Sequence, residues 1–124
     1  MKKLILILLI SLLCFSWGAE AKYRRTATVK YQKQYGWSKL YTVEVNFMSG
    51  HELNIATKTI SYDAISVYAI IFWSQDQVTI IKLKTFLACG FEVTKECIDD
   101  FMMDLQGFDQ DGDKWNICLI DTCF

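Results

Sequence analysis

Residues 67–83, VYAIIFWSQDQVTIIKL, constrain the fold more than any other segment, because their first arm is apolar on both faces of a strand. One face of that arm carries Val67, Ala69, Ile71 and Trp73, and the other carries Tyr68, Ile70 and Phe72. A strand of this kind needs cover on both sides. Residues 74–77, SQDQ, predict a turn, and the second arm, where lysines share a face with Ile80, predicts one solvent-exposed side.

Alternating hydrophobicity predicts further strands. Residues 38–57, SKLYTVEVNFMSGHELNIAT, predict a β-hairpin that turns at residues 48–52. The inner face of its first arm consists of Tyr41, Val43, Val45 and Phe47. Residues 26–33, TATVKYQK, predict an earlier strand, residues 58–66 a connection, and residues 114–120, KWNICLI, a last strand.

Residues 94–106 break the strand pattern and predict one amphipathic helix. Apolar residues recur there at spacings of three and four, namely Cys97, Ile98, Phe101, Met102 and Leu105. Thr94 is a suitable N-cap and Gly107 a suitable C′ residue. Asp104 in the last turn argues against this helix, since a carboxylate there meets the negative end of the macrodipole.

The first residues have the pattern of a secretory signal peptide. Lys2 and Lys3 form a positive start, an apolar stretch follows, and small residues precede Lys22. We therefore expect cleavage after residue 21, export to the periplasm or the extracellular medium, and no membrane span, because the stretch is too short for one. Cys14 would leave with the signal; the alternative, a lipoprotein cysteine, is disfavoured by the preceding Leu13.

Residues 22–124 are enough for one domain. They contain four cysteines, Cys89, Cys97, Cys118 and Cys123, and no CxxC motif. An even number of cysteines in an exported chain predicts two disulfides rather than a zinc site. Of the three pairings, the local one, Cys89 with Cys97 and Cys118 with Cys123, is slightly favoured; a crossed pairing would tie the helix to the last strand.

These patterns together predict an α+β fold. We expect a curled or closed antiparallel sheet of five to six strands with one amphipathic helix at about 94–106, stapled by disulfides near the C-terminus. The charge is uneven, because residues 22–58 hold seven basic and two acidic residues, whereas residues 92–124 hold two basic and nine acidic ones. The acidic balance and the predicted export both argue against nucleic-acid binding.

The segment GFDQDGDKWNIC, residues 107–118, offers a candidate metal site. Asp109, Asp111 and Asp113 have the spacing of the first three calcium ligands of an EF-hand. That motif also needs a glycine at its sixth position and a glutamate at its twelfth, where this chain has Lys114 and Ile120. A looser calcium site remains open. The simpler interpretation is a tight hairpin turn, with Asp111 and Gly112 at the centre of a type I′ turn.

The segment KYQKQYGWSKLY, residues 30–41, offers a candidate binding surface. Its aromatic residues Tyr31, Tyr35, Trp37 and Tyr41 alternate with the lysines Lys30, Lys33 and Lys39. Tyrosine and tryptophan are enriched at recognition surfaces, and lysines at the rim would attract an acidic partner. The alternative is that these rings are the inner face of the sheet.

Enzymatic activity is not expected. His51, the only histidine, lies in a predicted turn, and the chain has no GxSxG-like motif. By elimination, we expect a small exported binding protein with no cofactor: an inhibitor, an immunity-type factor or an envelope-assembly accessory, whose partner is an acidic protein or a second copy. A calcium-dependent binding or adhesion module is the alternative, and a small cell-wall hydrolase is third.

Overall fold

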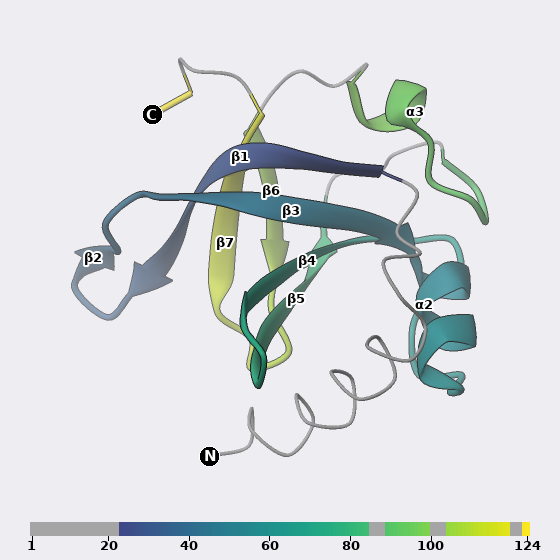
Figure 1. The fold of residues 1–124 in the computed structure, drawn as a ribbon. Coiled ribbons are helices and arrows are strands. Elements are labelled where there is room, and N and C mark those ends of the chain that lie inside the picture. Colours follow the sequence, from purple (N-terminus) through teal and green to yellow (C-terminus); the bar gives the residue numbers. More distant parts are fainter. Residues whose placement is uncertain (1–22, 85–88, 100–103, 120–122) are drawn as a thin grey trace.

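The computed structural model describes residues 23–84, 89–99, 104–119 and 123–124 (Figure 1). The strands are β1 (Tyr23–Lys33), β2 (Gly36–Trp37), β3 (Tyr41–Ser49), β4 (Val67–Ser74), β5 (Gln77–Leu83), β6 (Asp104–Phe108) and β7 (Lys114–Cys118), and the helices are α2 (Gly50–Thr57) and α3 (Lys95–Asp99). The predicted signal peptide and Cys14 lie outside the described residues. No helix within them is long and apolar enough to cross a membrane.

The strands form one closed antiparallel sheet. Its order is β1-β3-β4-β5-β6-β7, and β7 pairs again with β1, so that six strands make a barrel. Among the described strands, β2 pairs with β1 alone, and it extends the sheet beyond this barrel. The predicted antiparallel sheet is therefore confirmed in its closed form.

The main core fills the barrel. The inward residues alternate along each strand, and the fully buried ones include Val29, Val45, Phe47, Ile71, Ile81, Leu105 and Ile117. The predicted inner face of residues 41–47 is confirmed for β3, where Val45 and Phe47 are buried and Tyr41 and Val43 pack against them. Burying these side chains supplies most of the driving force for folding.

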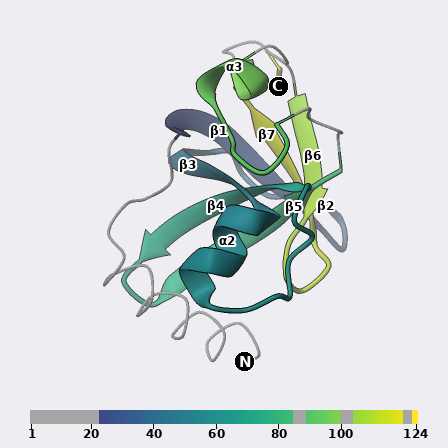
Figure 2. The same ribbon diagram turned by 90° about the vertical axis from the view of Figure 1, so that its right-hand side faces the viewer.

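A second apolar layer covers the outer face of β4 and β5. Helix α2 lies across these strands (Figure 2), and its Leu53 and Ala56 pack on Tyr68, Ile70 and Ile80. Residues 67–83 thus form the predicted hairpin, with the two-sided cover that its apolar first arm requires. In the second arm the predicted solvent-exposed side is confirmed at Lys82 but is wrong at Ile80, which α2 covers.

The hairpin predicted for residues 38–57 is wrong in its second arm, which is helix α2. The sequence Ser49-x-x-Glu52 is a capping box: the Ser49 hydroxyl accepts from the Glu52 backbone N–H at 3.0 Å, and the Glu52 carboxylate accepts from the Ser49 N–H at 2.9 Å. These two bonds satisfy N–H groups that a helix start leaves open. Gly50, which the sequence predicts to lie in a turn, is the first residue of this helix.

The helix predicted for residues 94–106 is wrong in its length. Helix α3 covers only Lys95–Asp99, residues 100–103 lie outside the described residues, and Asp104 begins strand β6. The N-cap contact of Thr94 is present, because its hydroxyl accepts from the Cys97 N–H at 3.3 Å. Gly107 does not end a helix. It lies in β6 where a Cβ atom would come within 2.3 Å of the Lys82 carbonyl oxygen, so the close approach of β5 needs glycine there.

Both disulfides follow the local pairing. Cys89 bonds Cys97 with Cα atoms 5.4 Å apart, and Cys118 bonds Cys123 with Cα atoms 5.7 Å apart. These separations are ordinary for disulfides. The crossed pairing is therefore excluded.

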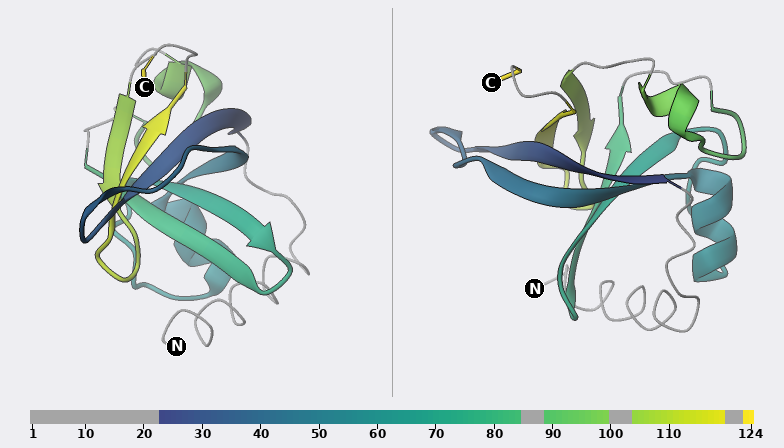
Figure 3. Two further views of the ribbon diagram at one scale, coloured as in Figure 1. Left: turned by 90° about the vertical axis from the view of Figure 1, so that its left-hand side faces the viewer. Right: turned by 45° about the horizontal axis from the view of Figure 1, so that its top comes forward.

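The barrel has two unlike ends, which Figure 3 shows from two sides. The α3 end holds the start of β1, helix α3 and the Cys89–Cys97 disulfide. The tip end holds the β4–β5 turn, the β6–β7 turn and a projecting hairpin of residues 30–41, here called the tip. In Figure 1 the tip extends well beyond the rest of the sheet.

Candidate functional site

The tip carries the most exposed aromatic side chains of the predicted binding surface. Tyr35 is 93% exposed and Trp37 is 40% exposed, and Leu40, also in the tip, is exposed too. Gly36 takes a φ of 138°, which allows the tight reversal from β1 to β2. A hairpin of this kind places large rings in solvent, where they can contact another molecule.

Lys30 orders one side of the tip. Its ammonium lies 4.7 Å from the centre of the Trp37 ring and 4.3 Å from the centre of the Phe124 ring. A cation held over two ring faces is attracted by their negative charge density. The C-terminal Phe124 therefore belongs to this surface, although no sequence pattern pointed to it.

The other two lysines lie over rings that are partly buried. The Lys33 ammonium is 6.0 Å from the centre of the Tyr31 ring, and that of Lys39 is 5.2 Å from the centre of the Tyr41 ring. Both tyrosines pack against the barrel core. Tyr31 and Tyr41 thus lie on the inner face of the sheet, which was the alternative interpretation of these rings. Tyr35 and Trp37 are exposed on the outside of the tip.

Tyr31 and Tyr41 belong to an aromatic cluster that fills the tip end of the barrel. Trp115 lies 4.9 Å from Tyr31 and 6.2 Å from Trp73, and Trp73 meets Tyr41 edge-on at 5.3 Å, all between ring centres. The Trp73 indole N–H donates to Thr79 at 2.8 Å. The sequence predicts Trp73 on one of two covered faces of its strand, but no local pattern joins Trp73 and Trp115 to the tip, because each comes from a different strand.

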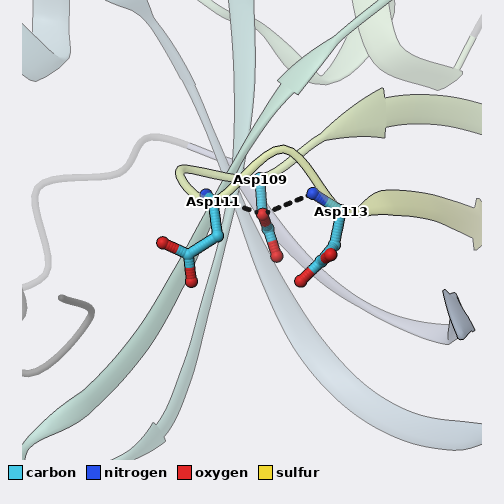
Figure 4. Close-up of side chains that lie close together, drawn as sticks. All are labelled: Asp109, Asp111 and Asp113. Atoms are coloured by element: carbon cyan, nitrogen blue, oxygen red, sulfur yellow. Dashed lines mark hydrogen bonds between the residues drawn. The ribbon is translucent and has the colours of Figure 1, made fainter. Parts of the chain in front are cut away.

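The aspartate turn joins β6 to β7 at the same end. The Asp109 carboxylate accepts three N–H groups. Those of Asp111 at 2.8 Å and Asp113 at 3.0 Å reach Oδ1 (Figure 4). The Trp115 indole N–H donates to Oδ2 at 2.9 Å. Asp109 is buried, while Asp111 and Asp113 are exposed. Asp109 therefore organises both the turn and the aromatic cluster behind it.

The turn is not the predicted type I′ turn. Gly112 has a φ of 87°, but Asp111 does not have a positive φ, and a type I′ turn needs both. The Gly112 N–H donates to the Asp109 carbonyl at 3.0 Å, and the Asp109 N–H donates to the Asp113 carbonyl at 2.9 Å. This is a three-residue hairpin loop with glycine in the left-handed position.

The three carboxylates nevertheless come close together. One oxygen from each of Asp109, Asp111 and Asp113 lies within 4.8 Å of the others. Oxygen atoms at such spacing suit calcium, whose ligands lie at about 2.3 to 2.6 Å from the ion. The predicted residues are thus gathered in one place, with Asp109 already engaged by three donors.

A polar network holds the α3 end. Asp99 accepts from the Tyr23 hydroxyl and, at 2.9 Å, from Arg25, and it pairs with Lys95 at 3.0 Å. Arg25 also donates to the Leu119 carbonyl at 2.6 Å. The Tyr23 hydrogen bond, together with the Lys95 and Arg25 charges, lowers the pKa of Asp99, and burial followed by the Asp99 bond raises the pKa of Tyr23.

His51, the only histidine, and Ser49, two residues before it, lie near this end too. The Ser49 hydroxyl accepts from Glu52 and donates to the Phe91 carbonyl at 2.7 Å, so it serves the cap of α2. His51 is exposed and lies against Phe91, with ring centres 5.1 Å apart. These contacts place Ser49 and His51 in helix capping and surface packing respectively.

Comparison of the chain with protein-family models, with curated proteins and with solved structures finds no match.

Proposed function

We propose that this chain is a small exported protein that works by binding a protein partner through the tip. The observation that carries the proposal is the projection of Tyr35 and Trp37 into solvent on a hairpin outside the closed barrel. Exposed rings on a rigid support give large contact area at low cost in conformational entropy.

Charge supports an acidic partner. Lys30, Lys33 and Lys39 take part in none of the ion pairs found among the described residues. Their ammonium groups are held over aromatic rings instead. Ordered cations of one sign at the rim of an apolar contact favour association with carboxylates and discriminate against basic partners.

Site-specific photo-crosslinking tests this proposal. We would place p-benzoylphenylalanine at Tyr35, incubate the oxidised protein with cell-envelope extract and with culture medium, irradiate, and identify adducts by mass spectrometry. A single dominant protein adduct that weakens with added salt is expected.

Phe91 is the matched control, because it is another exposed aromatic residue but lies near α3. The same photo-crosslinker at Phe91 should give no such adduct, and Trp37→Ala should remove the adduct formed from position 35. Equal adducts from both positions, or none from position 35, would contradict binding at the tip.

A calcium-dependent binding module is the second candidate function. The observation that favours it is the approach of the Asp109, Asp111 and Asp113 oxygens to within 4.8 Å. Calcium bound only to the native state would raise the melting temperature. The test compares thermal melts in millimolar calcium and in chelator, with the double substitution Asp111→Asn and Asp113→Asn as the control. Identical melting temperatures in the two buffers would rule this function out.

A further inference from the structure

Near the tip, the closed sheet is incomplete between β3 and β4. The ladder between β3 and β4 registers Asn46 with Ile70 and ends there, although both strands continue toward the tip end. Residues 41–45 of β3 are registered with β1 alone. In Figure 1 the two strands diverge beyond this point, β3 toward the tip and β4 toward the β4–β5 turn.

The backbone of β1 shows which groups of β3 face the gap. Tyr31 exchanges hydrogen bonds with Ser38, since its carbonyl accepts from the Ser38 N–H at 2.8 Å and its N–H donates to the Ser38 hydroxyl at 3.0 Å. Odd-numbered residues of β1 therefore direct their backbone groups toward β3. Bonded pairs alternate along an antiparallel ladder, so odd-numbered residues of β3 face β1. Thr42 and Glu44 then direct their N–H and carbonyl groups to the other side.

That side is an open strand edge. Among the described residues, no strand is registered with Thr42 or Glu44 on the side away from β1. Both side chains are exposed on the outer face. Behind the gap, Val43 and Trp73 are only partly buried, and they pack against the barrel core. An open edge of this kind is a template for pairing with another strand.

Resting on the function proposed above, we propose that the partner contributes an extended segment that adds as a strand to residues 41–45 of β3, with acidic side chains beside the tip. Main-chain bonds to Thr42 and Glu44 would hold the segment. Alternate apolar side chains of the segment would contact Val43 and Trp73. Carboxylates at the end nearest the tip would meet Lys39, which lies two residues before the strand.

Charge favours such a segment over a second copy of this chain. Two copies paired antiparallel about Val43 would set Lys39 of one copy beside Phe47 of the other. This arrangement would supply no carboxylate to the lysines of the tip. An acidic segment from another protein satisfies both the open edge and Lys39.

The test selects peptides from a phage-displayed library of random linear peptides on the immobilised, oxidised protein. We expect enriched sequences that alternate β-branched or aromatic residues with polar ones and that carry Asp or Glu. Glu44→Pro removes one edge N–H without touching the ladder to β1, and should weaken the enriched peptides about tenfold or more. Glu44→Thr, which keeps the N–H, should bind them as the parent protein does.

Circular dichroism and a thermal melt establish whether Glu44→Pro is folded. A second measurement does not need this variant: synthetic peptides of an enriched sequence are N-methylated at alternate residues. Methylation of the set that faces β3 should abolish binding to the parent protein, and methylation of the other set should leave it unchanged, because an edge bonds only every second residue. Equal loss from both sets would overturn strand addition.

The remaining outcomes separate this inference from the function proposed above. Peptides that bind Glu44→Pro normally but not Trp37→Ala would overturn strand addition and leave binding at the tip intact. Failure to enrich any peptide would overturn strand addition, while the crosslinking at position 35 reports on the tip independently. Self-association of the parent protein that Glu44→Pro abolishes would assign the edge to a second copy and would likewise overturn the proposal.

Discussion

The two ends of the barrel are closed by different means. At the α3 end, Ile98 of helix α3 and Val93 just before the helix cover the core, and a disulfide and the Asp99 network fix the helix in place. At the tip end, aromatic side chains fill the barrel themselves, and one buried carboxylate, that of Asp109, aligns the turn beside them. The difference shows that covalent and ionic restraints stabilise one end, whereas the other leaves rings, lysines and a strand edge accessible.

Because the tip end has one buried carboxylate in place of a disulfide, we expect its stability to depend most on the Asp109 side chain. Asp109→Ala leaves the N–H groups of Asp111, Asp113 and Trp115 without their acceptor and should lower the free energy of unfolding by about 3 kcal/mol. Urea denaturation measures the change. Asp111→Ala, at an exposed position, is the control and should shift stability by less than about 0.5 kcal/mol. Equal losses of stability from Asp109→Ala and Asp111→Ala would contradict the role of Asp109 in holding the turn and the aromatic cluster.

At the α3 end, the disulfide should come next in effect. Replacing both Cys89 and Cys97 by serine opens a loop with a sequence separation of 8 and should cost about 2.5 kcal/mol on the chain-entropy model. Denaturation of this variant measures the loss. If α3 stays docked, the shifted pKa of Tyr23 persists in a spectroscopic titration; a return to the ordinary value would mean that the disulfide also positions Asp99.

The Asp99 network adds a pH dependence to the α3 end. Asp99→Asn should cost about 2 kcal/mol near neutral pH, because a charge-assisted hydrogen bond to Arg25 is lost. The pKa of Asp99 is lowered from 3.8, so its contribution is fully present above that value and is lost as the pH falls through the lower folded-state pKa. The parent protein should therefore lose stability on acidification more steeply than Asp99→Asn. Parallel curves would contradict this role.

The smallest effect on stability is expected in the tip. Trp37→Ala should change the melting temperature by no more than about 2 °C, because Trp37 lies outside the barrel and loses mainly its contact with Lys30. The same variant should lose the partner in crosslinking. A large drop in the melting temperature would place Trp37 in the core and would erase the contrast between the two ends.

The sequence predicted the strands better than the helices. Period-two alternation located β3, β4 and β5, because each buries one continuous face in the barrel. Helix α2 was missed because Gly50 and the polar residues around it suggested a turn, although Ser49 and Glu52 have capping-box spacing. The helix expected at 94–106 was too long because Leu105 suits a helix face and a strand face equally well.

The sequence predicted which residues belong to the candidate site but not how they are arranged in space. Local spacing identified the residues of the tip and the three aspartates, because each set lies within one short segment of the sequence. The bond from Trp115 to Asp109 and the contact of Lys30 with Phe124 depend on closure of the barrel, which alternation alone cannot specify. The open edge at Thr42 and Glu44 depends on where a ladder ends, and such endings are set by strand curvature rather than by local sequence.

One side chain replaces part of a missing ladder between β5 and β6. These strands register only Lys82 with Phe108 and Leu83 with Gly107, and nearer the tip end the Gln110 amide accepts from the Ile80 N–H and donates to the Val78 carbonyl, each at 3.0 Å. The Gln110 side-chain amide can rotate away from the β5 backbone without any separation of β5 from β6. We therefore expect the Ile80 amide to exchange its hydrogen with solvent faster than its buried position suggests, and native-state exchange to report this seam as the first part of the barrel to open.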